Sequence, residues 1–198
     1  MSDRIAVFLD YQNVHLGAHK VYRPDGRKEH SIVHPLALAE RIVAKRKFGG
    51  ELTSVRVFRG RPRPELAPKT AAANDAQTAA WQRDERVVVT RRPLNYRHYP
   101  EQKPQEKGID VALSIDLVRA AIEEQADVLI AFTSDTDILP ALEFAFYRPG
   151  PRVEIAAWAK GNRALWFPEE KRNKRLLPYC HFLDEEDFEA VRDRTTYI

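Results

Sequence analysis

Residues 127–140 read DVLIAFTSDTDILP, and their pattern indicates the fold of the chain most clearly. Its apolar part, VLIAF at 128–132, is a short continuous run, which is the pattern of a strand buried on both faces of a sheet. A helical pattern follows at 136–150, where Pro140 is tolerated because it falls in the first turn. A buried strand that leads directly into a helix predicts an α/β protein with a parallel sheet.

The same alternation extends along the rest of the chain. Further strands are predicted at 4–9, 52–58, 86–90 and 153–158, and further helices at 34–50, 70–84 and 109–125. Between the first strand and the first of these helices we expect only a polar turn and a loop. The prediction is a mostly parallel sheet of about five strands in the order 3-2-1-4-5, with helices on both faces, within residues 1–160. Residues 161–198 are predicted to be a C-terminal extension that packs on this domain, with strand character at YCHFL, 179–183.

The composition is that of an ordinary globular protein, with 198 residues, 43% hydrophobic and 31% charged. No apolar run reaches the roughly 18 residues that a membrane helix requires, and the first residues, MSDRIAVFLDYQN, lack a signal-peptide pattern. We therefore expect a cytoplasmic protein without a membrane partner. Cys180 is the only cysteine, which excludes an intrachain disulfide and a cysteine-based zinc site.

The net charge of +3 hides an uneven distribution of charge. Between residues 41 and 63 there are eight basic residues and one acidic residue, and the last stretch, DEEDFEAVRD at 184–193, is acidic. If the candidate acids described next bind a cation, the remaining surface is more basic than the net charge indicates. This distribution favours an anionic polymer over a small neutral substrate as the partner.

Four aspartates stand where strands end or helices begin: Asp10, Asp110, Asp135 and Asp137. In the order 3-2-1-4-5, the strands that end near Asp10 and Asp135 are neighbours at the point where the strand order reverses, which is where such sheets bind ligands. A single aspartate at a helix start is explained by N-capping. Four together predict a Mg²⁺ or Mn²⁺ site, because hard cations prefer carboxylate oxygens and assist phosphodiester hydrolysis.

A long loop, RRPLNYRHYPEQKPQEK at 91–107, precedes Asp110 and mixes cationic with aromatic residues. A loop of this length inside a compact domain is usually functional. Arg92, Tyr96, Arg97 and Lys107 are predicted to contact the phosphates and unstacked bases of single-stranded RNA. The alternative is a solvated loop whose tyrosines pack on the domain.

Three segments of the chain resemble the NYN domain family, the LabA-like branch of the PIN-like ribonuclease superfamily. They are FLDYQN at 8–13, KGIDVALSIDL at 107–117 and TSDTDILP at 133–140. The resemblance implies a PIN-like Rossmannoid three-layer sandwich and a metal-dependent endoribonuclease that hydrolyses RNA. It also implies that Asp10, Asp110 and Asp135 are the core metal ligands.

The resemblance extends to residues around these ligands. It implies that Asp137 is a further catalytic acid, either an additional metal ligand or an acid that assists the ligands, and that Asn13 orients water or substrate. Ser134 stands where many relatives have glycine, and it is predicted to contact the substrate. Asp116 lies six residues after Asp110, about 240° further round an ideal helix, so that we expect only a supporting role for it.

Other functions fit the sequence less well. A phosphatase of the haloacid dehalogenase type would need an acid two residues after its nucleophilic aspartate, but Gln12 occupies that position. Dinucleotide binding would need a glycine-rich turn after the first strand, where only Gly17 is present. A non-catalytic RNA-binding or regulatory protein-interaction module on the same fold remains the alternative. The apolar segment ALEFAFY, 141–147, could support a homodimer.

Overall fold

The computed structural model describes residues 2–160, 165 and 178–197, so that the first part of the predicted C-terminal extension lies largely outside the described residues. The strands are β1 (Arg4–Asp10), β2 (Glu51–Arg61), β3 (Val87–Pro93), β4 (Val128–Phe132), β5 (Arg152–Trp158) and β6 (Tyr179–Leu183). The α-helices are α1 (Tyr11–Tyr22), α2 (Pro35–Ala44), α3 (Pro68–Trp81), α4 (Ile109–Ile122), α5 (Leu139–Tyr147) and α6 (Glu185–Val191). Two short 3-10 helices are η1 (Lys28–Ser31) and η2 (Thr136–Ile138).

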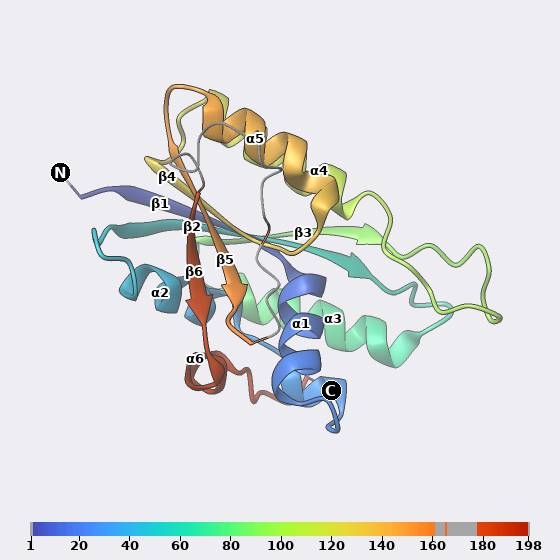
Figure 1. Cartoon of the computed structure of the whole chain (residues 1–198). Coiled ribbons are helices and arrows are strands. Elements are labelled where there is room, and N and C mark those ends of the chain that lie inside the picture. Colours follow the sequence, from blue (N-terminus) through green and yellow to red (C-terminus); the bar gives the residue numbers. More distant parts are fainter. Residues whose placement is uncertain (1, 161–164, 166–177, 198) are drawn as a thin grey trace.

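All the strands form one parallel sheet in the order β3-β2-β1-β4-β5-β6 (Figure 1). This arrangement confirms the predicted α/β fold and the order 3-2-1-4-5. The segment at 179–183, for which strand character was predicted, is the sixth strand and joins the sheet beside β5. The described helices include none that is long and apolar enough to cross a membrane.

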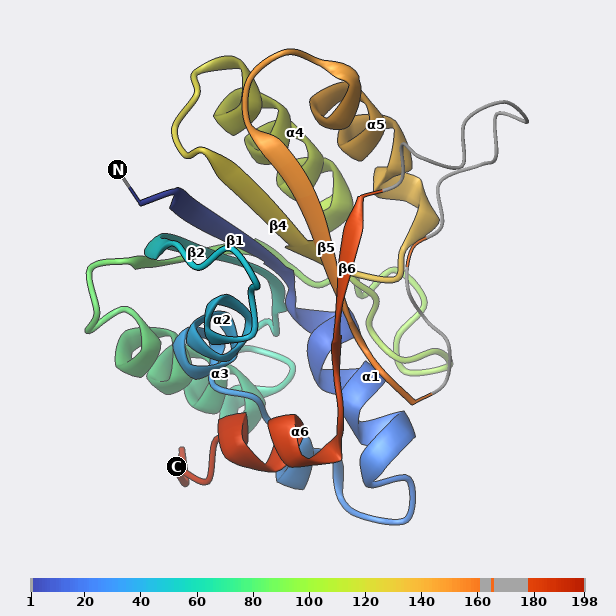
Figure 2. The same ribbon diagram turned by 60° about the vertical axis from the view of Figure 1, so that its left-hand side comes forward.

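Two hydrophobic cores lie on opposite faces of the sheet, and β1 contributes to both. Ile5, Val7 and Leu9 point into the core beneath α1, α2, α3 and α6, whereas Ala6 and Phe8 point into the core beneath α4 and α5. Figure 2 shows these two groups of helices on either side of the sheet. The alternation follows from the period of two in a strand, and it explains why β1 is a continuous apolar run.

Helix α1 occupies residues for which a polar turn and loop were predicted, so that this part of the prediction was wrong. Its buried side chains, Tyr11, Val14, Ala18 and Tyr22, lie along one face. Polar residues and Gly17 between them weaken the apolar pattern that marks a helix in the sequence. A Cβ atom at Gly17 would lie 3.2 Å from Trp158, so that the glycine permits close packing of α1 on β5.

The C-terminal residues that the structure describes are attached to the sheet and to α2. Strand β6 pairs with β5, and α6 contacts α2 through Asp187, whose side chain is fully buried. The Asp187 carboxylate accepts a hydrogen bond from Arg41 Nε at 2.6 Å and another from Lys45. Strand β6 therefore places β5 inside the sheet and makes Glu154 of β5 a buried residue.

Candidate metal centre

Three of the four candidate aspartates meet at the carboxyl end of the sheet. Asp10 is the last residue of β1, Asp135 follows β4 at the start of η2, and Asp110 lies in the first turn of α4. One carboxylate oxygen from each lies within 4.8 Å of the others. The cause is topological, since β1 and β4 are parallel neighbours that end side by side, and α4 begins above them.

The Asp10 carboxylate is buried and held by three hydrogen bonds. It accepts from the backbone N–H of Asn13 at 3.2 Å, as the N-cap of α1, and from Asn13 Nδ2 at 2.5 Å. It also accepts from Thr133 Oγ1 at 3.0 Å. Ser134 Oγ donates to the side-chain oxygen of Asn13 at 2.5 Å, so that Asn13 and Ser134 are linked to the cluster through Asp10.

Thr133 connects Asp10 with Asp135. Its hydroxyl donates to Asp10 and accepts from the backbone N–H of Asp135 at 3.0 Å. The Asp135 carboxylate in turn accepts from the backbone N–H of Asp137 at 2.9 Å. Asp137 itself is exposed and is not one of the three clustered acids.

Asp110 depends on Gly108, the N-cap of α4. Gly108 has a φ of 73°, a left-handed conformation that favours glycine. A Cβ atom there would lie 3.3 Å from Arg92 Nε, because the Arg92 side chain lies across the start of the helix. The absence of a side chain at Gly108 thus allows both the turn that aims Asp110 at the cluster and the close approach of Arg92.

The cluster is electrostatically uncompensated. Burial raises the pKa of Asp10, although hydrogen bonds from Asn13 and Thr133 oppose this, and the charge of Asp110 raises it further. Burial also raises the pKa of Asp110, with an added contribution from the charge of Asp135. None of the three acids forms an ion pair with a lysine, arginine or histidine among the described residues. An excess of buried negative charge without a protein cation is what a divalent cation would neutralise.

Glu106 is an acid near the cluster that the sequence reasoning overlooked. Its Oε1 accepts a hydrogen bond from the backbone N–H of Gly60 at 2.6 Å. Burial raises the pKa of Glu106, and the nearby charges of Asp10 and Asp110 raise it further. A Cβ atom at Gly60 would lie 2.9 Å from Glu106, so that a glycine at the end of β2 makes room for this carboxylate. The sequence around Glu106 gives no sign of this contact, because Gly60 lies 46 residues away.

The remaining candidates lie around the cluster or away from it. Lys107 and Arg97 are exposed on the loop, and Arg92 is exposed on β3. Tyr96 is half-buried, and its hydroxyl accepts from the backbone N–H of Arg63 at 3.3 Å. Asp116 is not among the clustered acids; it accepts hydrogen bonds from Arg56 at 2.9 Å and from Arg119 at 2.5 Å.

Comparison with known proteins gives a family match and a similar fold. The NYN domain family matches residues 4–182, which is most of the chain. A protein of unknown function from Vibrio parahaemolyticus has a similar crystal structure, with a TM-score of 0.52 and 18% sequence identity over 79% of this chain and 82% of that chain. At this identity the likeness shows a common fold alone. No significant match occurs among curated proteins. The finer placement in the LabA-like branch stays a prediction, but the length of the family match shows that the chain belongs to the NYN domain family, with its PIN-like nuclease fold.

Proposed function

We propose that this protein is a metal-dependent endoribonuclease that hydrolyses RNA phosphodiester bonds at the cluster of Asp10, Asp110 and Asp135. The observation that carries the proposal is the approach of three carboxylate oxygens to within 4.8 Å without a compensating cation among the described residues. Membership of a family with a nuclease fold supports the same reaction class. The uneven distribution of basic residues supports an anionic polymer as the substrate.

The donor set fits Mg²⁺ or Mn²⁺. These cations take oxygen ligands, and Mg²⁺ in particular needs only a few protein carboxylates because it retains several waters. Asp10, Asp110 and Asp135 would hold the ion, and Asp137 and Glu106 are the nearest further acids. A divalent cation bound there would activate water and neutralise charge on the phosphoryl oxygens.

The chain's own residues would orient the ligands and bind the substrate. Thr133 and Asn13 hold Asp10 in one orientation, so that the carboxylates are arranged before a cation arrives. The exposed cations Arg92 and Lys107, near the start of α4, would contact phosphates on either side of the bond to be cut. Tyr96 and Arg97 on the same loop would contact unpaired bases, which favours single-stranded RNA.

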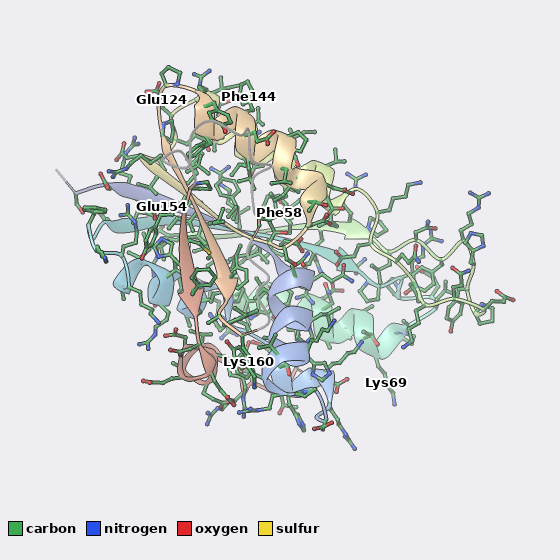
Figure 3. All side chains as sticks on the ribbon, viewed as in Figure 1. Phe58, Lys69, Glu124, Phe144, Glu154 and Lys160 are labelled. Carbon is green, nitrogen blue, oxygen red and sulfur yellow. The ribbon has the colours of Figure 1, made fainter. Side chains whose placement is uncertain are left out.

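The proposal also includes a cytoplasmic location and a homodimer through α5. Phe144 and Tyr147 of this helix are 46% and 59% exposed, and Figure 3 shows Phe144 on the outer side of α5. Light scattering of the parent protein and of Phe144→Ser tests the dimer. A parent protein that is monomeric at micromolar concentration would exclude it.

The decisive experiment is a Mn²⁺ and Mg²⁺ titration of metal-free protein with labelled single-stranded RNA. We expect metal-stimulated cleavage of a linear and of a circular RNA, since a circular substrate has no end for an exonuclease. Asp135→Asn should lower the rate about 10³-fold, as the loss of one charge-stabilising group commonly does. Asp127→Asn is the matched control, because Asp127 lies at the other end of β4 and pairs with Arg4 on the surface.

Two outcomes would count against the nuclease. RNA binding without metal-stimulated cleavage would favour the non-catalytic module. Equal cleavage by the parent and by Asp135→Asn would show that the activity does not come from this cluster. A branched DNA substrate, included in parallel, tests whether the same site cuts DNA flaps instead.

A further inference from the structure

A cavity lies on the α1 and α3 face of the sheet, and none of the three clustered acids lines it. It has a volume of about 570 Å³ and is enclosed by α1, η1, α3 and residues 192–197. This volume falls within the range of small-molecule sites. The side chains that matter for the argument are Tyr11, Lys28, Arg59, Gln77 and Tyr197.

The most unusual lining residue is Arg59 of β2. Its guanidinium packs against two adjoining aromatic rings, with Cζ at 4.8 Å from the ring centre of Tyr11 and 5.0 Å from that of Trp81. Nη1 donates to Gln77 Oε1 at 2.9 Å. Nε is buried and has no hydrogen-bond partner in the described part of the chain, which also offers no carboxylate within ion-pair distance of Arg59.

A buried guanidinium without an anionic partner is energetically unfavourable, because its desolvation is not repaid by pairing. The aromatic rings and the hydrogen bond to Gln77 fix the side chain in place, and Nη2 is left without a hydrogen-bond partner among the described residues. Elsewhere in the same sheet, Arg56 of β2 stacks on Phe8 in a similar way and is paired with Asp116. Arg59 thus has no ion pair among the described residues, whereas Arg56 on the same strand pairs with Asp116.

The surroundings of Arg59 are cationic. Four lysine or arginine side chains line the cavity, Lys28, Arg59, Arg192 and Arg194, against the two carboxylates of Glu29 and Asp193. Arg192 and Arg194 also pair with Glu189, at 3.2 Å and 3.4 Å, so that Lys28 and Arg59 are the cations without an ion pair among the described residues. Asp193 is already engaged, since it accepts from Trp81 Nε1 at 3.1 Å, from the Tyr197 hydroxyl at 2.6 Å and from the Thr195 N–H at 3.0 Å. Thr70, Asn74 and Thr196 also line the cavity.

We propose that this cavity binds a phosphate monoester of nucleotide size, with Arg59 as the main phosphate contact and Lys28 at the rim. Arginine suits this role because its planar fork of donors matches phosphate oxygens. The same chemistry has two sources: a free mononucleotide, or the phosphorylated end of an RNA strand. The hydroxyl and amide groups around the cavity would bind the sugar and base of either one.

The test is calorimetric binding in EDTA, where the acid cluster plays no part and cleavage cannot occur. We expect adenosine 5′-monophosphate to bind and adenosine to bind at least about 10-fold more weakly, since hydrogen bonds to a charged group supply most of the affinity. Arg59→Met should weaken binding of the monophosphate about 10-fold or more, and Lys28→Met about 3-fold. Arg56→Met is the matched control and should leave the affinity unchanged.

Short RNAs with a 5′-phosphate or a 5′-hydroxyl distinguish the two sources. Preference for the phosphorylated RNA over the mononucleotide identifies a strand end as the ligand, and equal affinity identifies the free nucleotide. Circular dichroism verifies folding of each variant, and Lys28→Met decides the question if Arg59→Met fails to fold. The proposal is overturned if the parent protein does not bind the monophosphate, or if Arg59→Met and Lys28→Met both bind it unchanged. Neither result affects the proposed nuclease.

Discussion

Two groups of buried acids in this sheet have opposite electrostatic surroundings. Glu154 of β5 lies between Arg46 Nη2, at 2.7 Å, and His181 Nε2, also at 2.7 Å (Figure 3 labels Glu154). Burial alone would raise the pKa of Glu154, but hydrogen bonds from His181 and Arg46 lower it to about 2. At Asp10 and Asp110 burial is met only by neutral donors and by other acids, and the pKa of each is raised.

Burial of an acid therefore does not by itself indicate a binding site. Glu154 has a positive partner from another segment of the chain and contributes to stability in the folded protein. The Asp10, Asp110 and Asp135 cluster lacks such a partner among the described residues, so that it gains most from a cation in solution. The presence or absence of a protein cation thus separates a structural acid from a candidate ligand.

The largest effect on stability is expected for a variant of Glu154, the acid with positively charged partners. Glu154→Gln should destabilise the protein by roughly 3 kcal/mol, because it leaves the Arg46 side chain, which is 1% exposed, with only the more distant carboxylate of Asp3, 3.6 Å from Nη1. Urea denaturation measures this loss. Metal-stimulated cleavage per folded molecule should remain at the level of the parent protein. If Glu154→Gln is as stable as the parent protein, or if it no longer cleaves RNA, then Glu154 does not differ from the clustered acids in the way proposed.

A smaller effect of opposite sign is expected at the cluster. Asp110→Asn should raise the melting temperature of metal-free protein by a few degrees at pH 7, because it removes a half-buried negative charge that lies close to other carboxylates. The pKa of Asp110 is higher in the folded protein than in the unfolded protein, so that its charge does not destabilise the fold at a pH below the unfolded pKa. The destabilisation grows as the pH rises above that value and is complete above the folded pKa. The advantage of the variant should therefore disappear near pH 3.

Glu154 supplies the matching control for this pH dependence. The pKa of Glu154 in the folded protein is lowered to about 2, below its value in the unfolded protein. The stabilising contribution of Glu154 is therefore present above the unfolded pKa and is lost as the pH falls through the folded pKa. Melting curves of the parent, Asp110→Asn and Glu154→Gln between pH 2 and pH 7, all in EDTA, measure both trends. A cluster variant that is no more stable than the parent at pH 7 would contradict the proposed electrostatic strain.

The smallest effect is expected for Asp116. Because this carboxylate is paired with Arg56 and Arg119 rather than with the cluster, Asp116→Asn should change metal-stimulated cleavage by less than about twofold. A rate assay at saturating Mn²⁺ measures it. A loss comparable with that of Asp135→Asn would show that the cluster extends further along α4 than its geometry indicates.

The sequence predicted the sheet well and the helices less completely. Strands such as 128–132 are recognisable because burial on both faces makes them continuous apolar runs. Helix α1 was missed because its buried residues are separated by histidines, amides and Gly17, which the chain tolerates only because β5 and α6 cover that face. Strand β3 also extends through Arg91 and Arg92, residues for which a loop was predicted.

Within the candidate site, the positions of Asp10 and Asp135 follow from topology and could be predicted. The contributions of Glu106 and Thr133 could not, because they depend on contacts between distant segments. Glu106 reaches the site through a hydrogen bond to Gly60, and Thr133 through its hydroxyl bridge between two aspartates. A side chain whose role depends on such contacts leaves little pattern in the sequence around it.

By itself, the sequence determined an α/β fold, its strand order and the motifs that place acids at strand and helix ends. These features depend on local periodicity and on the rules for connecting parallel strands. Which acids have a positively charged partner depends on the tertiary structure, because ion pairs such as that of Arg46 with Glu154 join residues more than one hundred positions apart. In the same way, only the tertiary structure shows that Arg59 Nε has no partner among the described residues, because its neighbours come from distant segments of the chain.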